Sequence, residues 1–164
     1  MSIRNDENPV AVSDAHTRAV GRICTEFFLD AAVGSADFFK GELVTALVFL
    51  AILRENVRHI EHTPENANAY GGVHSLPPND EREPVTIYVV AKVLGLTYET
   101  ARRHVKRLVE DGYCLRTERG LLVPAEVLTR PEVVRANERN LANFNKLLNN
   151  AVSAGLIEVE VKGG

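Results

Sequence analysis

Four cationic side chains are concentrated in a short stretch of the chain, between Ala101 and Val109, without an intervening acid. They are Arg102, Arg103, Lys106 and Arg107. An arginine can donate two parallel hydrogen bonds to the O6 and N7 atoms of guanine, and both arginine and lysine neutralise phosphate groups. The residue types in this stretch therefore favour contacts with the base edges and backbone of nucleic acid.

Helical periodicity predicts two short helices around these cations. In residues 98–110 the apolar side chains share one face and the cations lie opposite, while Thr97 is a suitable N-cap. Gly112 is a natural residue just past the helix end. Upstream, residues 87–94 carry apolar side chains at helical spacing, and Gly95 follows, where a sharp turn favours a residue without a Cβ. The pattern predicts a helix, a tight turn and a second helix.

A β-hairpin is predicted directly after the second helix, over residues 113–123. Two short apolar-rich segments, 113–117 and 121–123, flank Glu118, Arg119 and Gly120. Turn residues between two such segments are typical of a hairpin. We expect Arg119 to lie at the tip.

The sequence VAKVLGLTYETARRHVKRLVEDGYCLRTERGLLVP resembles the winged helix-turn-helix of bacterial transcription regulators. It is most similar to the DNA-binding domain of the catabolite-activator (Crp/Fnr) regulators, with weaker similarity to the MarR and ArsR groups. The resemblance covers about 40 of the 164 residues. The shared positions are Ala91, Gly95, Thr97, Glu99, Thr100, Arg103, His104, Lys106, Leu108, Asp111 and Gly112.

The resemblance implies a division of labour among these residues. In such regulators the residues that match Glu99 and Arg103 read base edges. Those that match Thr97, Thr100 and Lys106 hold phosphates. A carboxylate such as that of Glu99 can accept a hydrogen bond from cytosine N4, which agrees with the implied role.

Other residues extend or depart from this pattern. Arg102 and Arg107 suit phosphates, and Arg119 suits the minor groove or the backbone. Tyr98 stands where the Crp group usually has arginine, so the DNA sequence recognised should differ. The β-rich cyclic-nucleotide domain of that group has no counterpart in residues 1–84, so the resemblance implies nothing about cyclic nucleotides.

The charge distribution agrees with a localised anion-binding surface. The net charge is −3, yet residues 85–130 carry eight Lys and Arg against five Asp and Glu. The composition, with 45% hydrophobic and 25% charged residues, is that of a globular protein. The N-terminus lacks an apolar signal segment, and no apolar stretch reaches the roughly 18 residues that span a bilayer. We therefore expect a cytoplasmic protein that does not enter a membrane.

Catalysis is not expected. The sequence has no phosphate-binding glycine loop, nucleophile elbow or suitably spaced carboxylate pair, so we predict neither an enzyme nor a cofactor. His59, His62 and His74 offer an alternative as metal ligands, but histidines near a helix C-terminus are also favourable without metal. We expect no metal, and we expect Cys24 and Cys114 to be structural. His104 falls on an apolar face and is predicted to be packed.

Helical extensions flank the central segment. One helix is predicted from Ser13 or Asp14 to about Ala32, ended by Gly34-Ser35, and a second over residues 38–62. The second is apolar on nearly every side from Leu43 to Leu53, which favours packing within a dimer as well as within the protomer. Residues 64–84 contain four prolines and a Gly-Gly pair and predict a long surface loop.

The last helix is predicted to run from a capping box at residues 129–132 to about Ala154. Its apolar seam, with one asparagine that could fix register, favours a homodimer; alternatively, it packs on the chain itself. The tail 156–161 is predicted to be an edge strand. The seam comprises Val134, Asn137, Leu141, Phe144, Leu148 and Ala151.

Together these patterns predict a mainly α-helical protein. Residues 1–63 form an N-terminal helical segment for dimerisation or sensing, 64–84 a loop, 85–128 the winged helix-turn-helix, and 129–164 the last helix and a tail. The expected function is a dimeric transcription regulator that places helix 98–110 in the major groove of an inverted-repeat operator in double-stranded DNA.

Two alternatives stay open. A winged helix can serve as a protein-interaction module without sequence-specific DNA binding. The chain could also sense a small-molecule effector of unknown identity, held between the N-terminal helices under the 64–84 loop. The aromatic residues considered for that pocket are Phe27, Phe28, Phe38, Phe39 and Phe49.

Overall fold

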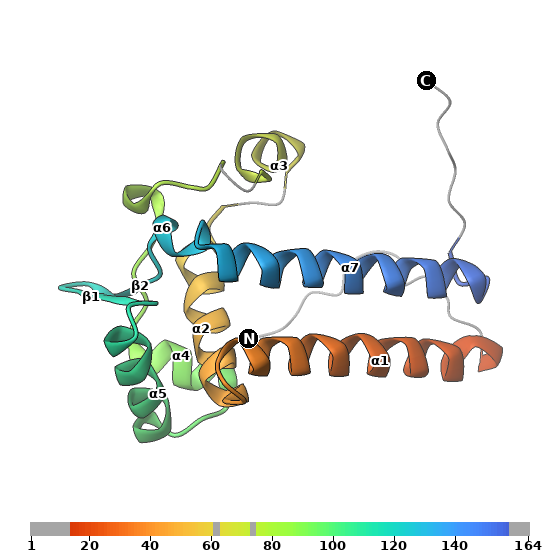
Figure 1. The fold of residues 1–164 in the computed structure, drawn as a ribbon, viewed down its shortest axis with the longest axis horizontal. Coiled ribbons are helices and arrows are strands. Elements are labelled where there is room, and N and C mark those ends of the chain that lie inside the picture. The colour runs from red at the N-terminus through yellow and green to blue at the C-terminus, as the bar shows by residue number, and fades with distance from the viewer. Residues whose placement is uncertain (1–13, 61–62, 73–74, 158–164) are drawn as a thin grey trace. The chain divides into compact units, whose positions relative to one another are not determined.

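The computed structural model describes residues 14–60, 63–72 and 75–157, and in these the chain is mainly helical with one small antiparallel sheet (Figure 1). The expected mainly α-helical class is confirmed at this level. Contacts divide the chain into two compact units. One unit holds the described parts of residues 1–31 and 140–164, and the other comprises residues 32–139. The elements are α1 (Asp14–Phe38), α2 (Leu43–Asn56), α3 (Pro64–Tyr70), the 3₁₀ turn η1 (Asn79–Glu81), α4 (Ile87–Leu94), α5 (Tyr98–Glu110), β1 (Leu115–Thr117), β2 (Gly120–Leu122), α6 (Ala125–Leu128) and α7 (Pro131–Ser153).

The core of the 32–139 unit forms where α2 packs against α4, α5 and β2. Its most buried large side chains come from all four elements and include Ile52, Val90, Val105, Leu108 and Leu121. Burial of these side chains supplies the main driving force for docking the elements. Because the apolar face of α5 is used in this way, its polar face must point to solvent.

Asn56, at the end of α2, satisfies three backbone groups of the segments beside it. Its Nδ2 donates to the carbonyl oxygens of Glu83, at 2.8 Å, and Leu121, at 3.0 Å. Its Oδ1 accepts from the backbone N of Val123 at 2.9 Å. The side chain is fully buried. Asn56 therefore fixes α2 to strand β2 and to the segment that leads into α4.

The predicted helix, turn and helix at residues 87–110 are confirmed as secondary structure. The α4 helix ends at Gly95, which adopts the left-handed conformation (φ 65°) that favours glycine. Thr97 caps α5 by accepting a hydrogen bond from the backbone N of Thr100. Gly112, past the end of α5, also has a positive φ of 73°.

The predicted hairpin is also present, with strands displaced by one or two residues from the expected bounds. Leu115 pairs with Leu122 and Thr117 with Gly120, so the two strands are joined by a two-residue loop. The free edge of β2 forms a bridge with Val85, at the start of the segment that leads into α4. The hairpin is thus attached to the same core as α4 and α5.

Three helix boundaries differ from the sequence-based expectation. The first helix does not stop at Gly34-Ser35 but continues to Phe38, because a glycine inside a helix costs only about 1 kcal/mol relative to alanine. The chain turns instead at Lys40 and Gly41, which both have positive φ. The second helix begins at Leu43, after this turn, rather than at residue 38. It ends at Asn56 rather than at residue 62, and the buried Asn56 side chain binds backbone groups of neighbouring segments.

The prediction that residues 64–84 form only a loop is wrong. Residues 64–70 form α3, because Thr63 accepts a hydrogen bond from the backbone N of Asn66 and Pro64 occupies the first turn. The hydroxyl of Tyr70 donates to Oε2 of Glu81 at 2.7 Å and so joins α3 to η1. Capping chemistry here outweighs the high content of turn-forming residues.

The other unit contains most of α1 and the second half of α7. Lys146 of α7 lies 2.7 Å from Oε1 of Glu26 and 3.0 Å from Oδ2 of Asp30, both on α1. These two carboxylates raise the pKa of Lys146. Along the predicted apolar seam, Leu141 is 60% exposed and Phe144 is 48% exposed. The seam is therefore not covered by the chain itself at these two positions.

The remaining expectations have mixed outcomes. Cys114 is buried, as predicted, but Cys24 is exposed and does not pack in a core. No helix in the described ranges is both long and apolar enough to cross a bilayer. The predicted strand at 156–161 lies largely outside the described residues, as do Ser13 and residues 1–12.

Candidate nucleic-acid interface

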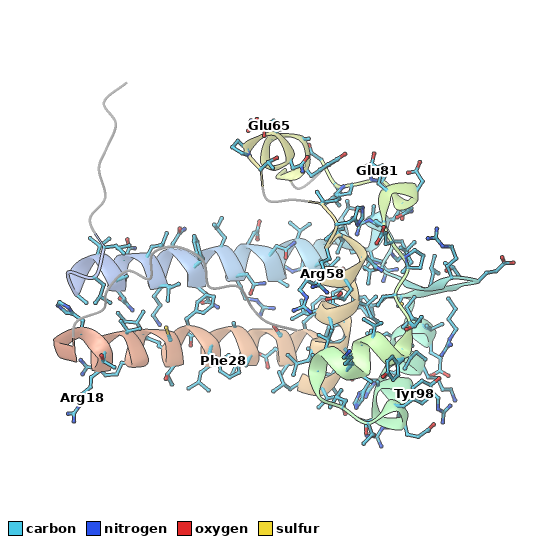
Figure 2. The ribbon with its side chains drawn as sticks, turned by 180° about the vertical axis from the view of Figure 1, so that it is seen from behind. Arg18, Phe28, Arg58, Glu65, Glu81 and Tyr98 are labelled. Atoms are coloured by element: carbon cyan, nitrogen blue, oxygen red, sulfur yellow. The ribbon has the colours of Figure 1, made fainter. Side chains whose placement is uncertain are left out.

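The four cations of α5 lie on the exposed face of the helix. Arg102, Arg103, Lys106 and Arg107 are exposed, whereas Ala101, His104, Val105 and Leu108 are buried. The alternation follows the helical period, so one face packs on α2 and α4 while the other presents positive charge. At the start of this face Tyr98 is 51% exposed and labelled in Figure 2.

The N-terminus of α5 is held by two threonines. Thr97 Oγ1 accepts from the backbone N of Thr100 at 3.2 Å and donates to Thr100 Oγ1 at 2.9 Å. The first turn of a helix presents N–H groups without helical partners and the positive end of the helix dipole. Both features favour a phosphate at this end of α5.

Glu99 is paired with Arg102 one turn along the same helix. The Arg102 guanidinium approaches Oε2 of Glu99 through Nε and Nη2, each at 2.9 Å. Both side chains are more than half exposed, and exposed pairs contribute only about 0–1 kcal/mol. The pair can therefore exchange for contacts with an incoming partner at low cost.

The two cations at the end of the helix also have acidic neighbours. Lys106 lies 3.6 Å from Oε1 of Glu110, and Arg107 lies 3.2 Å from Oε1 of Glu42 and 4.0 Å from Oδ2 of Asp111. All of these side chains are substantially exposed. These acids reduce the positive potential at the C-terminal end of α5 relative to its middle.

Arg103 and Arg119 differ from the other cations. Within the described residues, neither side chain forms an ion pair or a hydrogen bond. Arg103 is exposed in the middle of α5, and Arg119 is exposed in the loop of the hairpin. A cation without an internal acceptor is available to an external anion.

His104 connects the apolar face of α5 to α2. Its Nδ1 lies 2.8 Å from Oγ1 of Thr45, and both residues are buried, so the prediction of a packed histidine is confirmed. Burial lowers the pKa of His104, the charges of Arg103 and Arg107 lower it further, and Glu42 opposes them. His104 therefore positions α5 as a neutral side chain near pH 7 and does not belong to the cationic face.

Arg130, which the sequence reasoning did not identify, holds the chain just beyond α5. Its Nη2 donates to the carbonyl oxygen of Gly112 at 2.8 Å, and its guanidinium lies 5.2 Å from the ring centroid of Tyr113. Such a cation–π contact adds to the hydrogen bond. A lone arginine before a proline gives no sequence signal of this role, because the contact joins residues that are 18 positions apart.

The aromatic residues considered for a ligand pocket have other roles. Phe38, Phe39 and Phe49 pack with Tyr113 in edge-to-face and tilted contacts of 4.7–6.1 Å between centroids. Phe28 is 67% exposed. Phe38, Phe39 and Phe49 are thus part of the aromatic packing around the core. Aromatic residues at helical spacing are typical of a core as well as of a pocket.

The histidine alternative receives no support from the described residues. His59 lies 3.9 Å from a carboxylate oxygen of Glu83, and no three His, Cys, Asp or Glu residues in the described ranges are placed to share a metal ion. His62 and His74 lie outside those ranges.

Comparisons with family models, with curated proteins and with solved structures find no match to this chain.

Proposed function

We propose that this protein is a DNA-binding transcription regulator with a winged helix-turn-helix, in which α5 is the recognition helix and the β1–β2 hairpin is the wing. The observation that carries the proposal is the exposed cationic face of α5, at whose centre Arg103 has no partner among the residues that the structure describes. An exposed, positively charged helix that follows a short helix and a tight turn suits the major groove.

The contacts within α5 support different roles for its side chains. Arg103, which has no internal partner, is the base reader and donates to guanine. Lys106 and Arg107 bind phosphates, which replace the exposed acidic side chains that they contact in the free protein. Arg102 either orients Glu99 toward a cytosine amino group or releases it when Arg102 itself binds a phosphate.

The hairpin supports a second contact with the duplex. Its two-residue loop carries Arg119, whose side chain is unpaired in the described part of the chain, and the hairpin belongs to the same compact unit as α5. An arginine on such a loop can contact the backbone or a narrow minor groove. Two separated sites on one rigid body fix the orientation of the protein on DNA.

We further propose that the protein is a homodimer. On α2, Leu43, Leu47 and Leu50 repeat at helical spacing and are 38–41% exposed. On α7, Leu141 and Phe144 are also exposed. A second copy that covers either of these faces would relate two α5 helices by two-fold symmetry, with half-sites about 34–36 Å apart on an inverted repeat. A monomer in light scattering at micromolar concentration would contradict this arrangement.

The second candidate is a winged-helix protein-interaction module. It is favoured by the net charge of −3 and by the acidic neighbours of Lys106 and Arg107. The two candidates differ in the salt dependence of binding to duplex DNA. Several phosphate contacts release counterions, so the affinity of a DNA-binding protein falls steeply with salt, with a logarithmic slope of about −0.9 per phosphate.

The experiment combines selection with titration. Fragments retained by the full-length protein from random genomic DNA are sequenced, and fluorescence anisotropy then measures Kd for a selected and a random duplex over a range of salt concentrations. We expect an inverted-repeat motif and a steep salt slope for both duplexes. Failure to enrich any motif, together with a flat salt slope, would favour the interaction module.

A further inference from the structure

A cavity of about 540 Å³ lies between the C-terminal end of α2 and α3, in the 32–139 unit. This volume is within the range of about 300–1,000 Å³ that is typical of small-molecule sites. Its apolar walls come from four parts of the chain. They include Leu53 and Val57 near the end of α2, Ile60 after it, Leu76 beyond α3, and Leu128 of α6.

Among the described residues of its wall, the cavity has a single charged side chain, that of Arg82, which is only 4% exposed. Its Nε donates to the carbonyl oxygen of Pro77 at 3.0 Å. Its Nη1 is buried and has no hydrogen-bond partner. No carboxylate of the described residues lies within ion-pair distance of the guanidinium. Arg82 is therefore a buried cation that lacks a counterion.

The charges near Arg82 also leave it without a counterion in the described part of the chain. Burial lowers the pKa of Arg82, and the charge of Glu126 opposes that effect without forming an ion pair. Glu126 instead accepts hydrogen bonds from the side-chain amide of Asn79, both at 3.1 Å. A buried charge is stable when an opposite charge and hydrogen-bond acceptors accompany it. An anion beside Arg82 would supply both.

The shape and charge of the site define the anion. A planar guanidinium matches the two oxygens of a carboxylate, whereas a phosphate dianion would leave a surplus negative charge in a cavity with one cation. The aliphatic walls match a hydrocarbon chain or ring, because transfer of methylene groups from water to an apolar wall is favourable. Tyr70, Thr63 and Asn66 add the few polar groups of the lining.

We propose that this cavity binds a small apolar monocarboxylate, with its carboxylate group on Arg82 and its hydrocarbon part against Leu53, Val57 and Leu128. The site shares no residue with the cationic face of α5. It therefore stands whether or not the protein binds DNA.

The test uses the full-length protein and two pairs of probes, octanoate with octanamide and phenylbutyrate with phenylbutyramide. Calorimetric titration gives Kd, and thermal unfolding gives the shift in Tm. We expect saturable binding of at least one carboxylate and a higher Tm in its presence. We expect its amide to bind about 10- to 100-fold more weakly, as a hydrogen bond to a charged group implies. Equal affinity within each pair, or no saturable binding of either carboxylate at millimolar concentration, would overturn the proposal.

Variants locate the site. Arg82→Met should abolish the preference for carboxylate over amide, while Arg139→Met, which removes an exposed arginine on α7, should leave it unchanged. Leu76→Trp, which fills the cavity, should weaken the binding of acid and amide alike. If Arg82→Met does not fold, as judged by circular dichroism, Leu76→Trp decides. Unchanged octanoate and phenylbutyrate affinities in Leu76→Trp would place binding elsewhere and overturn the proposal.

Discussion

Arg102 contacts a single carboxylate oxygen of Glu99, Oε2, through both Nε and Nη2, each at 2.9 Å. Glu99, which the resemblance assigns to base reading, is therefore paired in the free protein with Arg102, a cation that suits phosphate. Because both side chains are exposed, the pair is weak and can rearrange on binding. Of the two residues proposed to read bases, it is therefore Arg103, not Glu99, that has no ion pair or side-chain hydrogen bond among the described residues.

The roles of Arg103 and Lys106 are distinguishable by substitution. Arg103→Ala should cost about 1–3 kcal/mol on a selected duplex and relax the preference at one base pair. Lys106→Ala should weaken selected and random duplexes equally and reduce the salt slope by about 1. Fluorescence anisotropy against both duplexes measures each effect. Arg18→Ala, which removes an exposed arginine of α1, is the matched control and should change neither quantity. Equal losses on both duplexes for Arg103→Ala would contradict base reading.

The Glu99–Arg102 pair predicts a gain as well as a loss. Glu99→Gln removes a negative charge from the cationic face and frees Arg102, so binding to a random duplex should become tighter. Discrimination between the selected and the random duplex should fall, because the acceptor for cytosine is weakened. The ratio of the two Kd values is the measurement. A variant that binds the random duplex no more tightly than the wild type would show that the pair does not restrain Arg102.

Asn56 should be a major determinant of stability. Replacement by leucine leaves the carbonyl oxygen of Glu83 and the N–H of Val123 without the Asn56 side chain, whereas the carbonyl oxygen of Leu121 keeps its bond from the backbone N of Val85. Each buried group left unsatisfied costs about 1–3 kcal/mol, so we expect a loss of at least about 2 kcal/mol in the free energy of unfolding. Urea denaturation followed by circular dichroism measures it. Asn145→Leu, at an exposed position of α7, should cost less than about 0.5 kcal/mol.

His104 should make stability depend on pH. Its pKa in the folded protein is lowered, so the unfolded chain binds the proton more readily. This contribution is complete above the unfolded value of about 6.5 and is lost as the pH falls through the lowered folded pKa. We expect Tm to decrease from pH 7.5 toward pH 5, and His104→Gln to reduce that decrease. An identical pH dependence in the variant would assign the effect to other groups.

The two cysteines should react very differently. Cys24 is exposed, whereas burial raises the pKa of the Cys114 thiol to about 11, so its thiolate is scarce at neutral pH. A thiol reagent such as a maleimide should modify one cysteine in the native protein and both after denaturation. Mass spectrometry of the labelled peptides identifies the sites. Labelling of Cys114 in the native protein at the rate of Cys24 would show that the core opens readily.

Local signals account for the parts of the structure that were predicted well. The α4–α5 segment has a threonine cap, a glycine at each required left-handed position and an uninterrupted helical period, so propensity and burial agree. The boundaries of α1 and α2 were less accessible. Gly34 is an acceptable interior residue in a long helix, and the end of α2 depends on partners of Asn56 that lie 27 to 67 residues away.

The candidate site was predictable in composition but not in connectivity. The cationic face follows from helical spacing alone. The contact between Arg107 and Glu42, and the support of Gly112 by Arg130, depend on how separate elements pack, and no local pattern encodes them. The buried guanidinium of Arg82 is likewise invisible in sequence, where an arginine next to acids is typical of a solvated turn.

The position of the hairpin depends on the absence of a side chain at Gly120. A Cβ at this position would lie 2.7 Å from the carbonyl oxygen of Val85, and the residue has a φ of 142°. Even an alanine here would force the hairpin away from Val85, the residue that bridges to β2. The direction in which Arg119 projects is thus set by Gly120, which has no side chain of its own. Genetic variation should tolerate exchanges at the tip of the loop far more readily than any replacement of the glycine beside it.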